Sequence, residues 1–193
     1  METELSAAAR DRGASPWSRS ERVRLLAWEW CWLLFCRWTP KPLWPWRNFW
    51  LQAFGAQLGH RVFVHQRARI AKPWNIALGD RACVGDAAVL YSLDRISVGP
   101  RATLAQEAYL CTGTHDFQDP SLPLRTAAIR IGADAFVGLR AIVLPGVEVG
   151  AGAIVGAGAV VTRNVAGGSV VAGNPARPLA RKGRTGFPPG LPQ

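Results

Sequence analysis

The side chains best suited to chemistry in this chain are its three histidines, His60, His65 and His115. Imidazole changes charge near neutral pH and also binds zinc, so acid–base catalysis and metal binding are the two chemistries to weigh. His115 lies in residues 113–120 (GTHDFQDP), which open a loop predicted over 113–128. This loop interrupts a regular pattern, and a long loop on a rigid repeat scaffold is usually functional. The sequence therefore marks His115 as a functional candidate.

The regular pattern is an aliphatic residue at every sixth position, often followed by glycine. Its cleanest run is Ile131, Val137, Val143, Val149, Val155 and Val161, and glycine follows four of these six residues. A period of six leaves no apolar stripe at helical spacing, and glycine and valine disfavour helix. Three such sixes make one coil, so the pattern predicts an all-β solenoid, a triangular parallel β-helix with one inward aliphatic side chain per face. The alternative is an ordinary alternating β-sandwich, although alternation alone does not place glycine so regularly.

Spacing and composition divide the chain into four parts. Residues 1–20 are polar and predict a flexible arm. Residues 21–55 predict a tryptophan-rich helical leader, and 56–165 predict the β-helix. The remaining residues, 166–193, predict a C-terminal arm and tail.

The leader holds most of the tryptophans, since eight of the nine lie between Trp17 and Trp50. Residues 21–38 contain no proline or glycine and predict a helix, which three prolines then end; a second helix is expected at about 46–54. The apolar run at 30–36 is far shorter than the roughly 20 residues that span a bilayer. Two interpretations stay open: a cap on the exposed strand edges of the solenoid, or peripheral membrane contact through 21–50, because tryptophan, leucine and arginine suit the headgroup zone.

The formal net charge is +10, and residues 163–193 contain several basic residues and no acidic one. An anionic ligand near that end is plausible. Elsewhere the basic residues are dispersed and lack an aromatic stacking platform, so no nucleic-acid partner is expected. The four cysteines have no CxxC spacing and predict neither a disulfide framework nor a zinc site. The first fifteen residues lack the apolar region of a secretion signal, so a cytoplasmic location is expected, with peripheral contact at the inner membrane face.

Several motifs carry a resemblance to a known family. They are Thr114-His115 at the loop base and the segments at 142–147 (IVLPGV), 155–162 (VGAGAVVT) and 172–177 (AGNPAR). Over about residues 55–181 the chain resembles the hexapeptide-repeat acetyltransferases of the galactoside, maltose and nodulation group. With the tryptophan-rich leader included, it is most similar to the acetyltransferases of colanic acid biosynthesis.

This resemblance implies a left-handed β-helix, a homotrimer with active sites at subunit boundaries, and acetyl-CoA as co-substrate with no metal. It further implies that His115 is the general base that takes the proton of a sugar hydroxyl as that oxygen attacks the thioester. The backbone amide of Leu139 would stabilise the oxyanion. The positions that match the family's coenzyme site are Gly138, Ala157, Thr162 and Arg177.

The acceptor site departs from the family pattern. The asparagine that contacts sugar in the family would fall near residues 84–86, where this chain has Val-Gly-Asp. Asp86 is the candidate replacement, and Tyr91 and Asp116 are further candidates for acceptor binding. The resemblance thus implies O-acetylation of a sugar or of a lipid-linked oligosaccharide in exopolysaccharide biosynthesis, and leaves the particular sugar open.

Two other functions remain as alternatives to this one. The γ-type carbonic anhydrases share the coil and bind zinc through three histidines, but they place a lone histidine before the pair, whereas His60 and His65 here precede His115. The second alternative is a scaffold without catalytic activity, docked by its leader to a membrane or to a polysaccharide-synthesis assembly.

Overall fold

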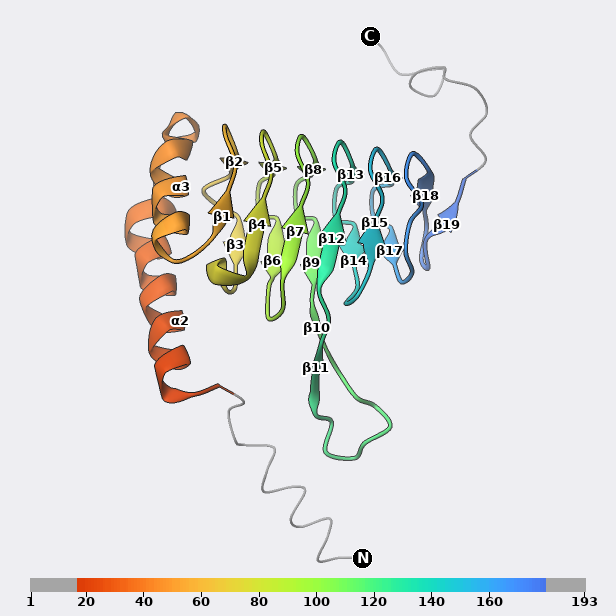
Figure 1. Ribbon diagram of the computed structural model, residues 1–193, viewed down its shortest axis with the longest axis horizontal. Helices are drawn as coiled ribbons and strands as arrows, with labels where there is room; N and C mark the ends of the chain where they lie inside the picture. The colour runs from red at the N-terminus through yellow and green to blue at the C-terminus, as the bar shows by residue number, and fades with distance from the viewer. Residues whose placement is uncertain (1–16, 180–193) are drawn as a thin grey trace, which may run out of the picture.

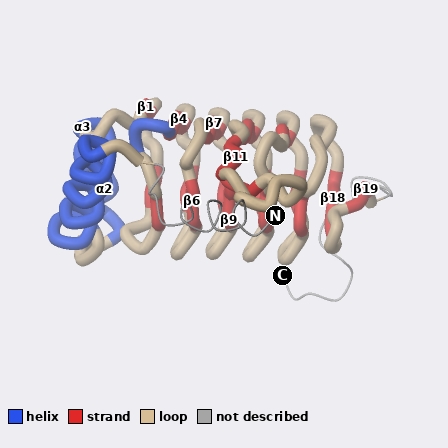
Figure 2. The backbone as a smooth tube through the Cα atoms, turned by 90° about the horizontal axis from the view of Figure 1, so that it is seen from below, coloured by secondary structure: helices blue, strands red, loops and turns tan. Residues whose placement is uncertain are grey.

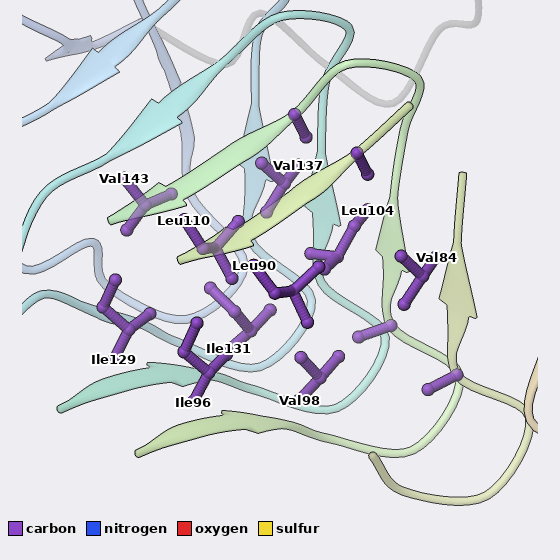
Figure 3. Packing of buried hydrophobic residues seen from close by; sticks show 14 of the residues in the cluster. Val84, Leu90, Ile96, Val98, Leu104, Leu110, Ile129, Ile131, Val137 and Val143 are labelled. Atoms are coloured by element: carbon purple, nitrogen blue, oxygen red, sulfur yellow. The ribbon is translucent and has the colours of Figure 1, made fainter. Parts of the chain in front are cut away.

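The period-six aliphatic residues form the interior of a three-sided parallel β-helix, as the pattern predicts (Figure 1). The computed structural model of the chain describes residues 17–179. In it Val84, Leu104, Val137 and Val155 are fully buried and stack on one another through parallel pairing of consecutive coils. Figure 3 shows such side chains from the three sheets converging on the axis of the solenoid. Most sides of a coil therefore bury one aliphatic residue, as expected for a repeat that contacts only its neighbours. One side buries two per coil, in the pairs Ile76 and Leu78, Ile96 and Val98, and Ile129 and Ile131.

Three parallel sheets make the sides of the prism, and the chain visits them in the repeating order A, B, C. Sheet A contains β1 (Gln57–Leu58), β4 (Ile76–Leu78), β7 (Ile96–Val98), β12 (Ile129–Ile131) and β15 (Glu148–Val149). Sheet B contains β2 (Phe63–Val64), β5 (Cys83–Val84), β8 (Thr103–Leu104), β13 (Phe136–Val137), β16 (Ile154–Val155), β18 (Val170–Ala172) and the antiparallel β19 (Arg177–Pro178). Sheet C contains β3 (Arg69–Ile70), β6 (Val89–Tyr91), β9 (Tyr109–Cys111), β14 (Ile142–Val143) and β17 (Val160–Val161).

The corner glycines are required by the close approach of consecutive coils. At Gly79 an added Cβ would lie 2.6 Å from the backbone nitrogen of Pro100 in the next coil. Backbone atoms cannot move aside as the end of a flexible side chain can, so a larger residue here would push the coils apart. This is the physical reason for the glycine that so often follows an aliphatic residue.

The outer faces of the three sheets differ in polarity. Sheet A presents polar or small side chains outward: Gln57, Ala77, Ser97, Arg130 and Glu148. Sheets B and C present mainly apolar ones, among them Phe136 and Ile154 on sheet B and Tyr109, Ile142 and Val160 on sheet C. Phe136, Ile154 and Ile142 are 42%, 39% and 37% exposed. Two adjacent faces of the prism are therefore apolar, and one is not.

The leader forms two helices that cover the first coil. Helix α2 (Arg19–Cys31) is capped by Ser18, whose hydroxyl accepts a hydrogen bond from the Glu21 N–H at 3.2 Å, and it continues as the π-helical turn η1 (Trp32–Cys36). The turn η2 (Lys41–Leu43) leads into α3 (Trp44–Ala53), and a further short turn, η3 (Pro73–Asn75), precedes β4. Figure 2 shows both helices stacked on one end of the prism.

Side chains from these helices supply the hydrogen bonds that the first coil lacks. In the solenoid each coil donates N–H groups to carbonyls of the next coil, as Phe63 N does to Ala82 O. The carbonyls of the first coil therefore have no preceding strand to donate hydrogen bonds to them. Trp28 Nε1 donates to Ile70 O at 2.7 Å, Arg47 Nε to Val64 O at 2.8 Å and Asn48 Nδ2 to Val62 O at 2.8 Å. The leader thus caps the sheet edges at this end.

Two boundaries differ from the expectations. The β-helix does not stop at residue 165, because β18 pairs in parallel with β16 (Val155 with Val171) and an isolated bridge joins Val149 to Val165. The step from Val161 to Val165 is four residues rather than six, so the period of six does not predict this last coil. The leader's first helix begins at Arg19, within the arm expected over 1–20. The rest of that arm (1–16) and the tail (180–193) lie outside the described residues.

Between β9 and β12 the chain leaves the prism as an antiparallel hairpin, β10 (Gly113–His115) and β11 (Leu124–Thr126). It replaces the simple loop expected over 113–128, and Figure 1 shows it standing out from the side of the solenoid.

Candidate active site

The hairpin holds His115 by a hydrogen bond that fixes the protonation of its ring. His115 is paired with Leu124 across the hairpin, and its Nδ1 lies 2.6 Å from the backbone carbonyl oxygen of Leu122. A carbonyl oxygen only accepts, so Nδ1 must carry the proton and Nε2 of the neutral ring keeps its lone pair. The imidazole is exposed, so Nε2 is free to accept a proton from a substrate hydroxyl.

The turn of the hairpin places the Leu122 carbonyl. Leu122 has a positive φ of 49°, and its N–H donates to Asp119 O at 2.9 Å. Asp119 in turn accepts hydrogen bonds from the backbone N–H and hydroxyl of Ser121, which lower the pKa of its carboxyl. This local network orders the segment that faces the histidine ring.

Asp116, predicted to bind the acceptor, is engaged within the hairpin. Its Oδ2 pairs with the Arg125 guanidinium at 3.1 Å, and its Oδ1 accepts from Gln118 N at 3.0 Å. The position next to His115 is thus tied to the opposite strand. Arg125 was missed in the sequence, because a loop has no periodicity from which a cross-strand partner can be deduced.

Tyr91 lies at the base of the hairpin. A Cβ added at Gly113 would lie 2.8 Å from Leu93 Cδ1 and 3.3 Å from Tyr91 Cε1, so glycine leaves room for both side chains beside the hairpin. The fully buried Thr112 anchors this base: its hydroxyl donates to Tyr91 O at 2.7 Å and accepts from Asp94 N at 2.9 Å. Thr112 was not singled out in the sequence, although a threonine directly before the glycine of a loop is a usable signal for such an anchor.

Gly138, Leu139 and Ala157 lie together on another edge of the prism, where sheet B turns into sheet C. A Cβ at Gly138 would come within 2.7 Å of Val155 O and 2.8 Å of Ala157 N, so this glycine also serves the stacking of coils. The Leu139 carbonyl accepts from Gly158 N at 2.8 Å, whereas its own N–H donates to no acceptor within residues 17–179. Leu139 therefore offers an unpaired amide donor on an edge lined by small residues.

Asp86 lies on the same edge, two coils nearer the cap, and it is not an isolated carboxylate. His65 Nδ1 is 3.0 Å and Arg67 Nε 3.3 Å from Asp86 Oδ1. His65 is buried, and desolvation lowers its pKa even though the neighbouring Asp86 opposes that shift.

The remaining two predicted coenzyme residues are on the surface toward the C-terminal end. Thr162 directly follows β17 and is exposed, on the edge where sheet C leads toward sheet A. Arg177 begins β19, and within residues 17–179 its Nη1 donates only to the neighbouring Ala176 carbonyl, at 3.1 Å.

One chain does not gather these residues into one site. The hairpin with His115 leaves the prism after sheet C, whereas Leu139, Gly138, Ala157 and Asp86 precede sheet C. A whole face of the prism separates the two groups. Within the described residues of one chain, no group of three or more histidine, cysteine, aspartate or glutamate side chains could hold a metal ion.

Comparisons with known proteins agree with this architecture. Residues 128–163 match the family model described as the hexapeptide repeat of succinyl-transferase. The chain is 38% identical over 139 residues to WcaF of Escherichia coli (strain K12), an acetyltransferase named for colanic acid biosynthesis, and the match covers 72% of this chain and 76% of WcaF.

Solved structures show the same fold at lower identity. A maltose O-acetyltransferase from Clostridium difficile 630 superposes with a TM-score of 0.77 at 23% identity, covering 84% of this chain and 88% of that one. A hexapeptide-repeat acetyltransferase of Vibrio cholerae, solved with acetyl coenzyme A, gives a TM-score of 0.78 at 19% identity and covers 90% and 97%.

The fold is therefore the left-handed β-helix of hexapeptide-repeat proteins, which confirms the predicted hand. The chain belongs to the hexapeptide-repeat acetyltransferases and is an acyltransferase, as the resemblance implied. No helix in residues 17–179 combines the length and the apolar character needed to cross a bilayer.

Proposed function

We propose that this protein transfers an acetyl group from acetyl-CoA to a sugar hydroxyl in exopolysaccharide biosynthesis of the colanic acid kind. The observation that carries the proposal is the hydrogen bond from His115 Nδ1 to the Leu122 carbonyl, because it leaves Nε2 as a base on an exposed hairpin. The identity to WcaF over most of both chains supports the choice of pathway.

The chemistry follows from the two groups described. His115 Nε2 takes the proton of the acceptor hydroxyl while the hydroxyl oxygen attacks the thioester carbonyl carbon. The Leu139 N–H donates to the oxygen that becomes negative in the tetrahedral intermediate. As the carbon–sulfur bond breaks, the protonated imidazole returns its proton to the departing sulfur, so the ester and the free thiol leave and the ring is neutral again.

The predicted coenzyme residues suit an extended thioester. Gly138 and Ala157 keep side chains off the edge that carries the Leu139 amide, so a pantetheine arm can approach the backbone there. Thr162, on the edge that leads from sheet C toward sheet A, can hydrogen-bond an amide of an arm that lies on the Leu139 edge of a neighbouring copy. Arg177, which forms no ion pair within residues 17–179, can meet a phosphate. Asp86 and Tyr91 are proposed to contact the acceptor.

A homotrimer would bring the separated groups together. Sheets B and C present adjacent apolar outer faces that flank the Leu139 edge, and assembly of three copies would cover this apolar surface. The proposed arrangement places the His115 hairpin of one copy opposite the Leu139 edge of its neighbour. The active sites are therefore proposed to lie at subunit boundaries.

The leader supports peripheral contact with the cytoplasmic membrane face, and with it a lipid-linked acceptor. The outer side of α2 and η1 carries Val23, Leu26, Trp30, Leu33 and Leu34 at helical spacing, all at least 42% exposed. The opposite side buries Trp28, Cys31 and Trp32 against the solenoid. A helix with an apolar stripe on each side can cap the coil and lie in a membrane interface at once.

The proposal is tested by following thiol release from acetyl-CoA with a panel of nucleotide sugars and oligosaccharides as acceptors. The wild-type protein should saturate with acetyl-CoA and turn over at least one acceptor. His115→Ala should bind CoA with unchanged affinity in a calorimetric titration and lose about 10² to 10⁴ in turnover. Near-normal turnover of the variant would remove the assigned base, and a wild-type protein that binds no CoA would indicate a scaffold instead.

A further inference from the structure

A column of buried polar side chains, Lys72, Ser92 and Thr112, runs along the edge of the prism where sheet C turns into sheet A. The three residues occupy equivalent positions of the first three coils. Each follows by two residues an interior aliphatic residue that pairs in register with the next, in the order Ile70, Leu90 and Leu110. Lys72 is 3% exposed, and Ser92 and Thr112 are fully buried. Burial of a polar side chain is unfavourable unless that side chain is paired, so the partners of this column explain its presence.

The two hydroxyls of the column tie each coil to the next. The Ser92 hydroxyl accepts a hydrogen bond from Lys72 N at 2.9 Å and donates one to Lys72 O at 3.0 Å. The Thr112 hydroxyl donates to Tyr91 O at 2.7 Å and accepts from Asp94 N at 2.9 Å, so it holds the backbone on both sides of Ser92. The three corners are therefore linked in series.

One end of the column is the base of the hairpin that carries His115. Strand β10 begins at Gly113, directly after Thr112. The returning chain is tied to the same residue, because Ala127 N donates to Thr112 O at 2.9 Å. The place of the hairpin on the prism thus depends on how Thr112 is held.

The other end of the column is held by the leader. The Lys72 ammonium nitrogen lies 2.6 Å from Glu21 Oε1, in the first turn of α2, and 3.6 Å from the ring centroid of Trp17. Figure 1 shows the start of α2 and the hairpin projecting from the same side of the prism. A buried ammonium depends on its charged partner, since removal of that partner leaves an uncompensated charge that favours water. Movement of Lys72 toward water would pull on the backbone groups that bond to Ser92.

We propose that Lys72 and Ser92 are positioning residues for catalysis, through which Glu21 of the leader holds Thr112 and the His115 hairpin in place. The base must lie within hydrogen-bond reach of the acceptor hydroxyl, and a displacement of about 1 Å can cost about a hundredfold in rate. This inference rests on the proposed role of His115. It gives α2 a second task besides capping, which is to support the catalytic hairpin from two coils away.

The test measures turnover of two variants of the full-length protein with acetyl-CoA and a soluble acceptor. Ser92→Ala removes both bonds to the Lys72 backbone, and Glu21→Gln removes the charged partner of the Lys72 ammonium. Each should lower kcat by about tenfold to a hundredfold. The Kd for CoA in a calorimetric titration should stay unchanged, because the proposed coenzyme residues lie in the later coils.

Glu29→Gln is the matched control. It makes the same charge change on α2, at an exposed residue that forms no ion pair within residues 17–179. Its turnover should equal that of the wild type, and a loss as large as that of Glu21→Gln would overturn the proposal.

Hydrogen exchange separates positioning from a general loss of stability. In Glu21→Gln the amides of Asp116 and Ala127, which bond within the hairpin and at its base, should exchange about tenfold faster. The amide of Gly156, which bonds between later coils, should keep its wild-type rate. Equal acceleration at Gly156, or none at Asp116 and Ala127, would contradict a role specific to the hairpin.

A double-mutant cycle tests whether the two ends of the column act together. Glu21→Gln and Thr112→Val should combine to lower kcat by less than the product of their separate effects, because both release the same hairpin. A combined effect equal to that product would show that the two residues act independently, against the proposal.

Failure of this inference is distinguishable from failure of the proposed function. A wild-type protein that turns over, with Glu21→Gln equal to it in kcat and in exchange, would refute only the role of the column. A wild-type protein that binds no CoA would refute the acetyltransferase proposal, and hydrogen exchange would still decide whether Glu21 holds the hairpin. If circular dichroism shows that Ser92→Ala does not fold, Glu21→Gln decides, since Glu21 is only partly buried.

Discussion

At the scale of single residues, two histidines have opposite environments. His115 is exposed on a hairpin with its Nδ1 held by a carbonyl, which suits a group that takes up and releases a proton. His65 is buried at an edge of the first coil, where its Nδ1 lies 3.0 Å from Asp86 Oδ1 and 3.3 Å from Arg67 N. The first environment favours catalysis, and the second favours a structural role for a neutral ring.

The buried histidine gives a prediction about pH and stability. Burial lowers the pKa of His65 in the folded protein; Lys41, Arg47 and Arg67 also lower it, whereas Asp86 opposes them. The unfolded chain, with an ordinary histidine pKa of about 6.5, then binds this proton more readily. The stability that His65 contributes is therefore complete above that value and is lost as pH falls below it, toward the lowered folded pKa.

The measurement compares urea unfolding at pH 7.5 and 5.5. His65→Asn keeps an acceptor for Arg67 N and cannot be protonated, so its stability should fall less between the two pH values than that of the wild type. A variant that loses as much stability as the wild type would show that other groups cause the decline.

At the scale of elements, the leader is tied to the solenoid by hydrogen bonds from side chains. Arg47 is fully buried and donates to Val64 O, Thr39 Oγ1, Pro40 O and Lys41 O, so it joins α3 both to the first coil and to the segment between the helices. No apolar residue could satisfy these carbonyls.

Arg47→Met should therefore destabilise the protein strongly. Methionine has a similar length but no donor. The buried Val64 carbonyl left unpaired costs about 1–3 kcal/mol, and the three part-buried bonds to residues 39–41 add to this, so a loss of about 3 kcal/mol or more is expected. The urea unfolding midpoint measures it. Arg22→Met, on the exposed part of α2, is the matched control and should change the midpoint little.

The outer stripe of the same leader gives a separate prediction. Trp30→Ser combined with Leu34→Ser removes two of its most exposed apolar side chains without touching the buried side of α2. Co-sedimentation with anionic lipid vesicles should fall by about tenfold or more, because each buried apolar side chain contributes about 1.5–3 kcal/mol. Leu122→Ser, on the hairpin, should sediment as the wild type does; unchanged sedimentation of the double variant would contradict the membrane proposal.

At the scale of the whole molecule, the prism has two apolar faces and one polar face. The proposed catalytic amide and base lie on different edges of one chain, and the apolar faces are adjacent to the edge that carries Leu139. Both observations favour assembly through faces B and C, with an active site that is incomplete in a single copy.

Phe136→Asp or Ile142→Asp should dissociate the assembly. Each places a charge on an apolar outer face, so analytical ultracentrifugation should show monomers while circular dichroism still shows the β-helix. Turnover should fall in proportion to the loss of trimer. Ser97→Asp on sheet A is the control and should remain trimeric and active. A fully active monomer would disprove a site shared between subunits.

The sequence by itself determined the solenoid, its core and the position of the hairpin. Because each coil contacts only its neighbours, equivalent positions in successive coils have the same environment. Spacing alone therefore places Val137, Val143 and Val149 in the interior. The candidate base His115 was likewise visible, because it interrupts that spacing.

Only the tertiary structure decided the contacts that the repeat does not encode. Arg47 and Trp28 meet carbonyls 17 and 42 residues away, and His115 meets a carbonyl made available by the turn at Leu122. Nothing periodic relates these partners, since each bond depends on where a helix or a hairpin docks on the finished prism. The tautomer of the His115 ring and the capping of the first coil both follow from such docking.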